Sequence, residues 1–406
     1  MSKIKTVIFI VCFYLIYIMV KLTTLVFKLL RLRHLSRFRN KDIYYLEVFP
    51  MDGAGYNYRV KKWCELFQQN GYTTKAAVLI KNSPTFFKLT SPANLQYFIL
   101  LSMLKRYFQI LKALRYKNII VRRSILLYND YGNFFMEKLL YSMHNKVVLD
   151  FDDDISNYDN DFESRSLFQK IMMHQAQYFF HSFKYYQGFI VGSDYLKEHI
   201  LLANYQVELK NICVIPTCVD YEKYKAKEYV DDFKNKKIVF GWIGGTHNLV
   251  LLHSIITALN KLSQKKEIEL LIISGVKDYP FQQEFPIKFI QYRIENEIND
   301  LLKIDIGLMP LFDDKTSRAK CGFKLIQYMG LGIPGVASAI TVNNQIVDDG
   351  ENSWLVYDDD WYKVLSKIVN QLDDLQAIGI KAREKIIKNY SLNSNYKKYH
   401  EFLFHT

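Results

Sequence analysis

Two lysines and a glutamine late in the chain have a spacing that suits the binding of an anion. A helix over 320–331 is predicted by the apolar pattern of the stretch RAKCGFKLIQYMGLGIPGVAS, residues 318–338, and on it Lys320, Lys324 and Gln327 share one stripe. Cations in the first turn of a helix oppose its dipole, and a diphosphate would relieve that conflict through backbone N–H groups and charge-assisted hydrogen bonds. The stretch therefore indicates an anion site or, in the simpler interpretation, a solvated basic helix start.

A pair of glycines earlier in the chain is a second feature typical of an anion site. In the stretch VFGWIGGTHN, a predicted strand runs into Gly244 and Gly245 and then into a helix that begins with Thr246 and His247. A backbone without side chains can approach a phosphate closely and direct N–H groups at it. The stretch is neither G-x-G-x-x-G nor a P-loop, and the next strand ends at Ser274 without the acid of dinucleotide sites, which disfavours a dehydrogenase. A tight turn that needs glycine is the alternative.

Four aspartates follow a predicted strand in the first half of the chain. The stretch KVVLDFDDDI contains Asp150, Asp152, Asp153 and Asp154. Their hard carboxylate oxygens suit a divalent cation. A solvated strand end is the alternative interpretation.

Glycines and arginines at two other strand ends are further candidates. Gly53 and Gly55 follow the first predicted strand and suit a loop pressed against a ligand, and Arg59 lies just beyond them. Arg122 and Arg123 end another predicted strand, so at least one of them is expected to face a ligand cleft. Packing and surface roles are equally compatible with these positions.

Short apolar runs alternate with helical stretches in two series, which is typical of parallel sheets covered on both faces. The predicted strands are 43–49, 74–80, 118–121, 146–151, 188–191 and 212–215 in the first series and 237–243, 268–274, 287–290, 304–309, 335–338 and 354–356 in the second. The predicted helices are 56–69, 94–115, 164–183, 247–264, 294–303 and 322–330, with helical sequence again from 360 to 404 interrupted near Tyr390. The charged stretch 221–237 is predicted to link the two series. We therefore expect an α/β protein with two Rossmann-like domains that face a central cleft.

The expected domains follow from these limits. They are an N-terminal membrane anchor with its basic flank at 1–40, a Rossmann-like domain at 41–228, a second Rossmann-like domain at 236–386, and a C-terminal helix at 387–406 that packs back on the first domain.

The composition excludes two classes of function. Of the net charge of +13, most comes from nine lysines and arginines that precede the first acid, Asp42, so the remaining chain is close to neutral and requires no nucleic-acid partner. The five cysteines are scattered, with no Cys-x-x-Cys pair and no histidine at zinc-ligand spacing, which disfavours a structural zinc site and fits a reducing compartment.

The N-terminus is predicted to be a retained hydrophobic helix. Residues 6–20 are apolar without a polar face, and apolar sequence continues to residue 30 with Lys21 and Lys28 as interruptions. A basic run follows instead of a small-residue cleavage site, which disfavours a signal peptide and, by the positive-inside tendency, leaves the body of the protein in the cytoplasm. The helix either spans the membrane or lies in its interface.

The second half of the chain resembles the GT-B retaining glycosyltransferases of family 4. The resemblance lies in the donor-site stretch 318–338 with VNNQIVDDGEN (342–352), and it extends to GWIGG (241–245), DIGLMP (305–310) and VIPTCVD (214–220). It covers nearly the whole chain after residue 42. The family resemblance implies two domains that clamp a nucleotide sugar, bound mainly by the second domain.

The resemblance also implies roles for the candidate residues. Diphosphate contacts are expected from Gly245, Thr246 and Lys324, together with Arg318 or Lys320, and Gly244 and His247 are expected in the same donor site. Ribose contacts are expected from Gln327, which replaces the second glutamate of a Glu-x7-Glu pair. The first glutamate of that pair has no counterpart near Ala319. Asp152 or Asp153 is expected to orient or deprotonate the acceptor hydroxyl, with Gly53, Gly55, Arg59 and Arg122 at the acceptor side of the cleft.

The resulting hypothesis is a membrane-associated enzyme of polysaccharide biosynthesis, with its catalytic body in the cytoplasm. It would transfer a sugar, with retention, from a nucleotide sugar to a lipid-linked or cell-surface glycan acceptor, with no metal and no other cofactor. Two alternatives are a non-catalytic nucleotide-sugar-binding or scaffold protein of the same fold, and a metal-dependent Asp-x-Asp glycosyltransferase that uses the cluster of Asp150, Asp152, Asp153 and Asp154.

Overall fold

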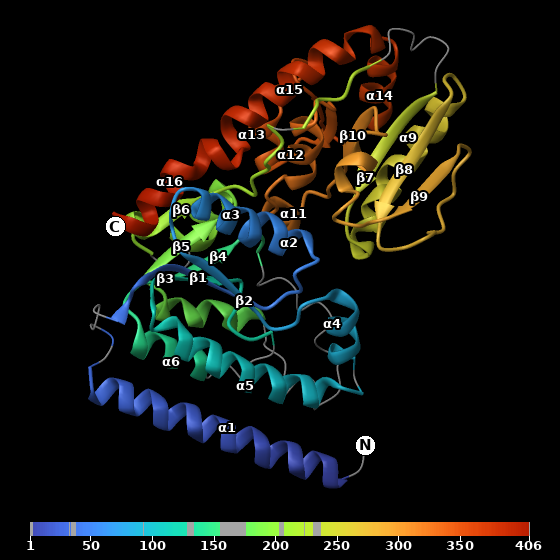
Figure 1. Ribbon diagram of the computed structural model, residues 1–406. Coiled ribbons are helices and arrows are strands. Elements are labelled where there is room, and N and C mark those ends of the chain that lie inside the picture. Colours follow the sequence, from blue (N-terminus) through green and yellow to red (C-terminus); the bar gives the residue numbers. More distant parts are fainter. Residues whose placement is uncertain are drawn as a thin grey trace. The chain divides into compact units, whose positions relative to one another are not determined.

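The chain folds into two compact α/β units. The computed structural model describes residues 3–31, 33, 38–91, 93–127, 134–154, 176–202, 207–222, 224–229 and 237–405 (Figure 1). Unit 1 comprises Met1–Gly192, Leu196–Ile215 and Lys398–Thr406, and unit 2 comprises Ser193–Tyr195 and Pro216–Lys397. Each unit contains one six-stranded sheet.

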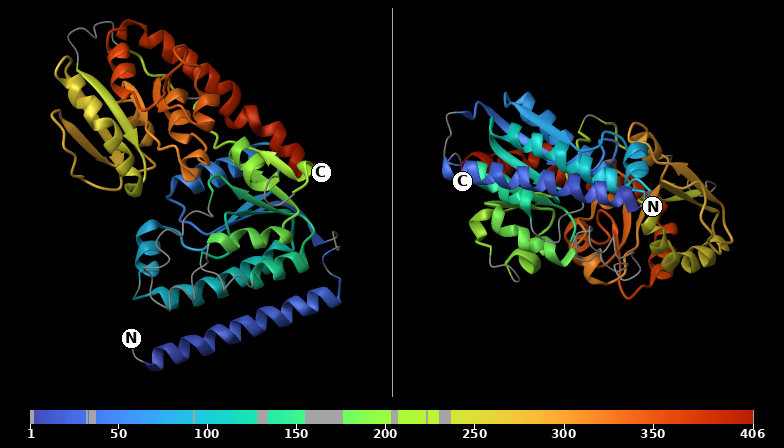
Figure 2. Two further views of the ribbon diagram at one scale, coloured as in Figure 1. Left: turned by 180° about the vertical axis from the view of Figure 1, so that it is seen from behind. Right: turned by 90° about the horizontal axis from the view of Figure 1, so that it is seen from below.

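The sheet of unit 1 is entirely parallel, in the order β2-β1-β3-β4-β5-β6. Its strands are β1 (Lys41–Glu47), β2 (Thr74–Val78), β3 (Tyr116–Arg122), β4 (Val147–Phe151), β5 (Gly188–Val191) and β6 (Ile212–Val214). Its helices are α1 (Lys3–Leu29), α2 (Ala54–Tyr56), the π-helical turn η3 (Asn57–Lys61), α3 (Lys62–Gln69), α4 (Ser83–Thr90), α5 (Leu95–Ala113), α6 (Phe135–Met143), η5 (Ala176–Tyr185), η6 (Leu196–Leu202) and η7 (Leu209–Asn211). Helix α1 lies alongside α5 and α6 on one side of this unit (Figures 1 and 2).

The sheet of unit 2 is also parallel, in the order β12-β11-β10-β7-β8-β9. Its strands are β7 (Ile238–Ile243), β8 (Ile268–Ser274), β9 (Ile287–Gln291), β10 (Ile306–Met309), β11 (Gly335–Ser338) and β12 (Trp354–Val356). Its helices are the 3-10 helix η8 (Thr246–Leu252), α9 (His253–Ser263), α10 (Glu297–Leu301), α11 (Lys315–Arg318), α12 (Phe323–Gly330), α13 (Thr341–Ile346), α14 (Trp361–Val369), η9 (Leu372–Asp374) and α15 (Leu375–Tyr390). The last helix, α16 (Leu392–Phe404), starts in unit 2 and ends in unit 1.

The predicted alternation of strands and helices is confirmed by these two sheets. All twelve predicted strands are present, because strands buried on both faces appear in the sequence as short continuous apolar runs. Strand β4, for example, is buried along its whole length. The sequence did not indicate α4, which begins where the Asn82 side chain accepts a hydrogen bond from Thr85 N. The helix predicted over 164–183 falls outside the described residues as far as 175.

Apolar packing holds each strand end in place. In unit 2, Phe240 and Trp242 of β7 and Leu270 of β8 are at most 1% exposed and belong to one core with residues of α9 and α14. Full burial of such side chains contributes roughly 1.5–3 kcal/mol each. In unit 1, the end of α16 is packed in the same way, since the ring centre of Tyr399 lies 4.6 Å from that of Trp63. The residues that follow the strands are therefore attached to well-packed parts of each unit.

The start of α12 depends on a glycine. Gly322 precedes the helix with φ +68, and a Cβ there would lie 2.3 Å from Ile346 Cδ1. Gly350 has a similar φ of +77, but a Cβ there would meet nothing within 4 Å. The two glycines therefore share the same backbone strain and differ in steric contact.

We expect Gly322→Ala to lower the free energy of unfolding by about 2–4 kcal/mol, because the left-handed conformation and the contact with Ile346 both act against a side chain. Gly350→Ala, the matched control, loses only about 1 kcal/mol, from the backbone conformation alone. Urea unfolding of both variants measures the difference. Equal losses would show that the contact with Ile346 does not constrain the start of α12.

Candidate functional site

The carboxyl ends of β7 and β8 meet the first turn of α12 at one edge of the unit 2 sheet. A Cβ on Gly244 would lie 2.6 Å from the Trp242 ring and 3.1 Å from Lys324 Cε. Gly275 follows β8 and lies next to the start of η8, because a Cβ on this glycine would lie 3.2 Å from Thr246 Oγ1. The glycine turn, Thr246 and Lys324 are thus brought together at the edge where parallel α/β sheets bind ligands.

The charge of Lys324 is held at this edge. Its Nζ lies 5.4 Å from the centre of the Trp242 ring, which is itself only 1% exposed. A cation over an indole ring is attracted by the negative face of the ring. Helix α12 begins at Phe323, and its N-cap residue, Gly322, has no side chain that could cap it. This edge therefore combines an ammonium group, a helix start and a glycine turn, all of which favour a negative ligand.

The prediction of a helix that starts at Lys320 is wrong, whereas the helix expected at 322–330 is present as α12. The preceding helix, α11, ends at Arg318, so Lys320 lies between the two helices. Asp314 Oδ1 accepts a hydrogen bond from Ser317 N at 2.7 Å, which caps the start of α11, and the left-handed Gly322 separates it from α12. Lys320 therefore does not share a helical stripe with Lys324 and Gln327. Its side chain is half-buried and has no ion-pair partner among the described residues.

The other predicted donor residues differ in their surroundings. Arg318 is exposed and pairs with Asp313, from Nε to Oδ1 at 2.6 Å and from Nη2 to Oδ2 at 2.8 Å. His247 is exposed beside Gly245 at the start of η8. Gln327 is only 3% exposed, and within the described part of the chain no side-chain hydrogen bond reaches its amide. Of the three, Gln327 is the buried one.

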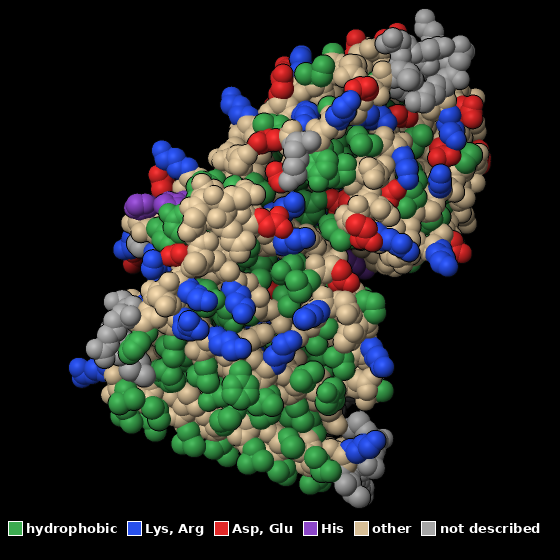
Figure 3. Space-filling model, viewed as in Figure 1, with side chains coloured by type: hydrophobic (Ala, Val, Ile, Leu, Met, Phe, Trp, Pro, Cys, Tyr) green, Lys and Arg blue, Asp and Glu red, His purple; other side chains and the backbone are tan. Residues whose placement is uncertain are grey.

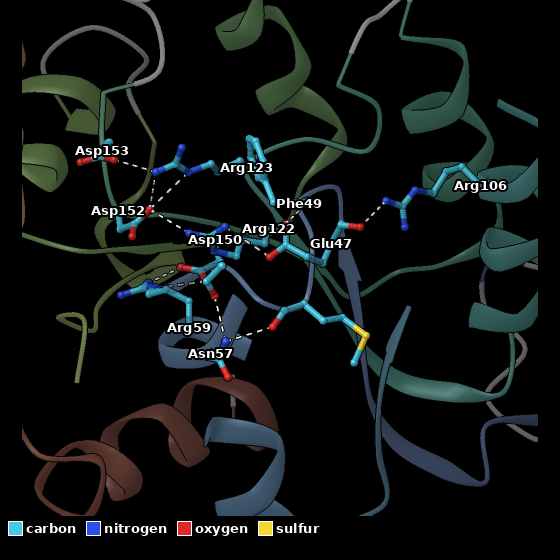
Figure 4. Close-up of polar contacts among 12 residues, drawn as sticks. Glu47, Phe49, Asn57, Arg59, Arg106, Arg122, Arg123, Asp150, Asp152 and Asp153 are labelled. Carbon is cyan, nitrogen blue, oxygen red and sulfur yellow. Dashed lines mark hydrogen bonds and ion pairs between the residues drawn. The ribbon is translucent and has the colours of Figure 1, made fainter. Parts of the chain in front are cut away.

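The predicted residues of unit 1 form a network of ion pairs at the ends of β1, β3 and β4 (Figure 4). Arg59 pairs with Asp150, with both side chains 2% exposed, and donates from Nη1 to Ile215 O at 2.6 Å. Burial alone would lower the pKa of Arg59, but Asp150 and Asp152 raise it above its ordinary value. Arg59 is therefore fixed in the interior rather than turned towards a ligand.

Asp152 is surrounded by positive charge. Arg123 Nη2 lies 3.1 Å from Asp152 Oδ1 and 2.6 Å from Asp153 Oδ2, and Arg122 Nη2 lies 3.5 Å from Asp152 Oδ1. Burial would raise the pKa of Asp152, but Arg123, Arg122 and Arg59 lower it well below its ordinary value. Asp152 is therefore a weak base, and its carboxylate orients the two arginines. The Asp153 side chain is more accessible, at 27% exposed.

The backbone at the end of β3 is shaped for these contacts. Arg123 has φ 61, a left-handed conformation that is uncommon for a residue with a side chain. Gly55 packs directly on Arg122, because a Cβ there would lie 2.5 Å from Arg122 Nη2. Gly53 precedes α2 in an extended conformation and makes no comparable contact. The glycine loop thus accommodates the Arg122 guanidinium.

Sequence reasoning missed two residues of this network. Glu47, at the end of β1, is fully buried, and its Oε2 lies 3.2 Å from Arg122 Nη1. Arg106 of α5 is also fully buried and donates to three backbone oxygens, those of Glu47 at 2.9 Å, Ile125 at 2.8 Å and Ala77 at 3.2 Å. Burial lowers the pKa of Arg106 to about 10. The available signal for Glu47 was a charged residue inside the apolar run YYLEVF, whereas Arg106 directly follows Lys105 and had no such signal.

The aspartates of unit 1 are engaged with arginines rather than arranged for a metal. Asp150, Asp152 and Asp153 each have an arginine partner. Within the described ranges, no group of three His, Cys, Asp or Glu side chains has an arrangement suited to a metal ion. These pairs disfavour the metal-dependent Asp-x-Asp alternative, because a cation would have to displace the guanidinium groups.

The lowered pKa of Asp152 predicts an acid-dependent contribution to stability. The contribution is fully present above the unfolded pKa of about 3.9 and is lost as the pH falls towards the lower folded value. We therefore expect the free energy of unfolding to fall more steeply below about pH 4 in the wild type than in Asp152→Asn.

At neutral pH, Asp152→Asn should cost about 3–5 kcal/mol, because it leaves arginines in the interior without their partner. Asp153→Asn, at a more exposed position, is the control and should cost less than about 1 kcal/mol. Denaturant unfolding between pH 2 and pH 7 measures both effects, and parallel pH profiles of wild type and Asp152→Asn would contradict the assignment of charge to Asp152.

The comparisons with known proteins agree with this geometry. Residues 237–374 match the family model described as "Glycosyl transferases group 1". Among curated proteins, no sequence matches the chain. The narrower assignment to family 4 is not tested by the family match.

Solved structures resemble the chain over most of its length. HepE from Anabaena, solved with UDP and glucose, has a TM-score of 0.65 at 13% identity and covers 90% of this chain and 100% of its own. Sucrose-phosphate synthase from Thermosynechococcus elongatus has a TM-score of 0.60 at 13% identity, with the same coverage. The lipopolysaccharide outer core galactosyltransferase WaaB has a TM-score of 0.56 at 13% identity and covers 90% of this chain and 99% of its own. Residues 237–374 therefore match a group 1 glycosyl transferase domain, and the chain that carries this domain has the GT-B fold.

Proposed function

We propose that the protein transfers a sugar, with retention of the anomeric configuration, from a nucleotide sugar to a lipid-linked or cell-surface glycan acceptor. The observation that carries the proposal is the meeting of Lys324 with the Gly244–Gly245 turn inside the matched domain. The structural neighbour HepE was solved with UDP and glucose, so UDP-sugars are the first donors to test.

The proposed donor chemistry follows from charge. As the glycosidic bond breaks, negative charge grows on the leaving nucleoside diphosphate, and groups fixed beforehand stabilise that state more than they stabilise the donor. We assign this role to the Lys324 ammonium, the backbone N–H of Gly245 and the Thr246 hydroxyl. Gln327 is assigned to the ribose hydroxyls, because its buried amide can donate and accept. Neither a metal nor another cofactor has a role in this proposal.

The acceptor role is assigned to unit 1. Asp153 is the more accessible carboxylate of the network and is the proposed contact for the acceptor hydroxyl. Asp152 and Arg123 are positioning residues for it, because Arg123 pairs with both aspartates. The low pKa of Asp152 argues against that residue as the base.

The acceptor class is proposed from α1. This helix is long and apolar enough to cross a membrane, although only 11% of its most apolar window is buried inside the protein. An apolar helix on a transferase keeps the enzyme where amphiphilic acceptors accumulate. We therefore propose that the enzyme works at a membrane, with its body on the cytoplasmic side.

We expect Lys324→Ala to lower turnover of the donor by about 10²–10³-fold, because it removes a fixed charge from the leaving diphosphate. Lys315→Ala, on the exposed surface of α11, is the matched control and should retain activity. Release of nucleoside diphosphate from a panel of nucleotide sugars measures both. If no donor is turned over but nucleotide sugars still bind, the non-catalytic alternative is correct.

The metal and stereochemical parts of the proposal are tested on the same protein. Full activity in the presence of a chelator is expected, because Lys324 and the helix end supply the positive charge. Loss of activity that returns on adding a divalent cation would contradict this. The anomeric configuration of the product, determined by NMR, should match that of the donor, and an inverted product would refute retention.

The acceptor class is tested on the exposed side of α1. Leu15→Glu places a charge at a side chain that is 63% exposed, and we expect it to reduce transfer to a lipid-linked acceptor at least about tenfold while hydrolysis of the donor is unchanged. Leu209→Glu, at an equally exposed position on η7, is the matched control. Equal loss of both reactions, or loss of neither, would argue against an acceptor presented at a membrane.

A further inference from the structure

Unit 1 carries an exposed apolar face along α1 and α5. Large apolar side chains of α1 between Val7 and Leu29 are 46–72% exposed, and Tyr97, Leu104 and Phe108 of α5 are 40–61% exposed. We call these residues the apolar face, and Figure 3 shows hydrophobic side chains gathered over this side of the unit. We propose that the apolar face rests on an anionic lipid bilayer with α1 lying in the plane of the membrane, rather than crossing it. This inference extends the membrane association proposed above.

The inner side of α1 is docked on unit 1. Val20 is fully buried and Phe9 is 4% exposed. The ring centre of Tyr17 lies 5.3 Å from that of Phe135 in α6, in an edge arrangement. These contacts run along the helix, so a helix perpendicular to the membrane would either detach from unit 1 or draw α5 and α6 into the hydrocarbon.

A hydrogen bond joins α1 to α5 as well. Thr23 Oγ1 lies 3.0 Å from Tyr107 OH, and Tyr107 is 8% exposed. Detaching α1 would leave this buried hydroxyl group without its partner on α1, which is unfavourable. The contact therefore favours the docked helix.

The chain is also fixed just after α1 ends. The Arg33 guanidinium lies 3.8 Å from the centre of the Tyr141 ring, and its Nε donates to His144 O at 3.2 Å. Arg39 donates to Arg33 O at 2.7 Å and to Asn145 Oδ1. These attachments leave only a few residues between Leu29 and the first fixed point. A spanning helix joined to unit 1 by a free tether does not fit this geometry.

Charge selects an anionic surface as the partner. The sequence from 1 to 41 contains nine lysines and arginines and no acid. The sequence from 66 to 129, which includes α4 and α5, also contains no acid and has seven lysines and arginines besides Arg106, Arg122 and Arg123 of the internal network. Lys5, Lys21 and Lys28 of α1 are exposed beside the apolar face. An apolar face with cations of one sign around it is complementary to negatively charged headgroups above hydrocarbon.

The depth of α1 in a bilayer separates the two arrangements. Single tryptophans are introduced on the outer side of the full-length chain as Ile8→Trp, Leu15→Trp and Val26→Trp, at positions that are 57%, 63% and 50% exposed. Quenching by lipids brominated at shallow or deep acyl positions is measured in vesicles with and without phosphatidylglycerol, with the wild-type signal subtracted. We expect all three sites to be quenched alike and most strongly by the shallow bromines, with binding at least about tenfold weaker when the anionic lipid is omitted.

A spanning helix gives a different profile. Leu15 lies near the middle of α1, so it would be quenched most by the deep bromines and the two end positions by the shallow ones, which would overturn the proposal. Absence of quenching together with a stable dimer in solution would overturn it too, because a second copy would then cover the apolar face. The quenching is independent of catalysis, so failure to find a sugar donor leaves its outcome interpretable.

Discussion

The ammonium group of Lys324 lies against the ring of Trp242 and beside the Gly244–Gly245 turn, and this contact sets the electrostatics of the unit 2 strand ends. Two parts of the chain produce it. Gly244 and Gly245 follow directly after β7, and Lys324 lies in the first turn of α12, which starts after the left-handed Gly322. A cation in such a position has little solvent to reorganise when negative charge develops nearby, and fixed charge of this kind is a major source of rate enhancement in group transfer. The enzymatic interpretation of the chain depends on that arrangement.

At the strand ends of unit 1, the charged side chains are paired with one another. Arginines and acids are matched there inside the protein, and the contacts of Arg59, Arg122 and Arg123 with their acids join β1, β3 and β4. Breaking one of these pairs is costly because the remaining ion keeps its desolvation penalty. The network therefore defines the ends of three strands, and Asp153 stands at its more accessible border. Unit 1 thus provides a rigid frame at its strand ends, whereas the strand ends of unit 2 present the Lys324 ammonium beside a glycine turn.

The sequence predicted the sheets well because parallel strands buried on both faces appear as uninterrupted apolar runs. The glycine turn and Lys324 were also predictable, since residue type and spacing carried the signal. The error at Lys320 came from local backbone choices, because α11, capped by Asp314, ends at Arg318, and the left-handed Gly322 lets α12 begin only at Phe323. The ion network was beyond prediction, because its partners are far apart in sequence. Arg59 and Asp150 are separated by 91 residues, and Glu47 and Arg122 by 75 residues.

The central claim, that Lys324 and the glycine turn hold the diphosphate of the donor, is tested most directly by a pair of binding measurements. Calorimetric titration of wild type and Lys324→Ala with a nucleoside diphosphate, and separately with the nucleoside alone, isolates the energy contributed by the phosphates. The account predicts that the substitution weakens binding of the diphosphate by about 10–100-fold and leaves binding of the nucleoside unchanged. Equal affinities of the two proteins for the diphosphate, or an equal loss for both ligands, would contradict it.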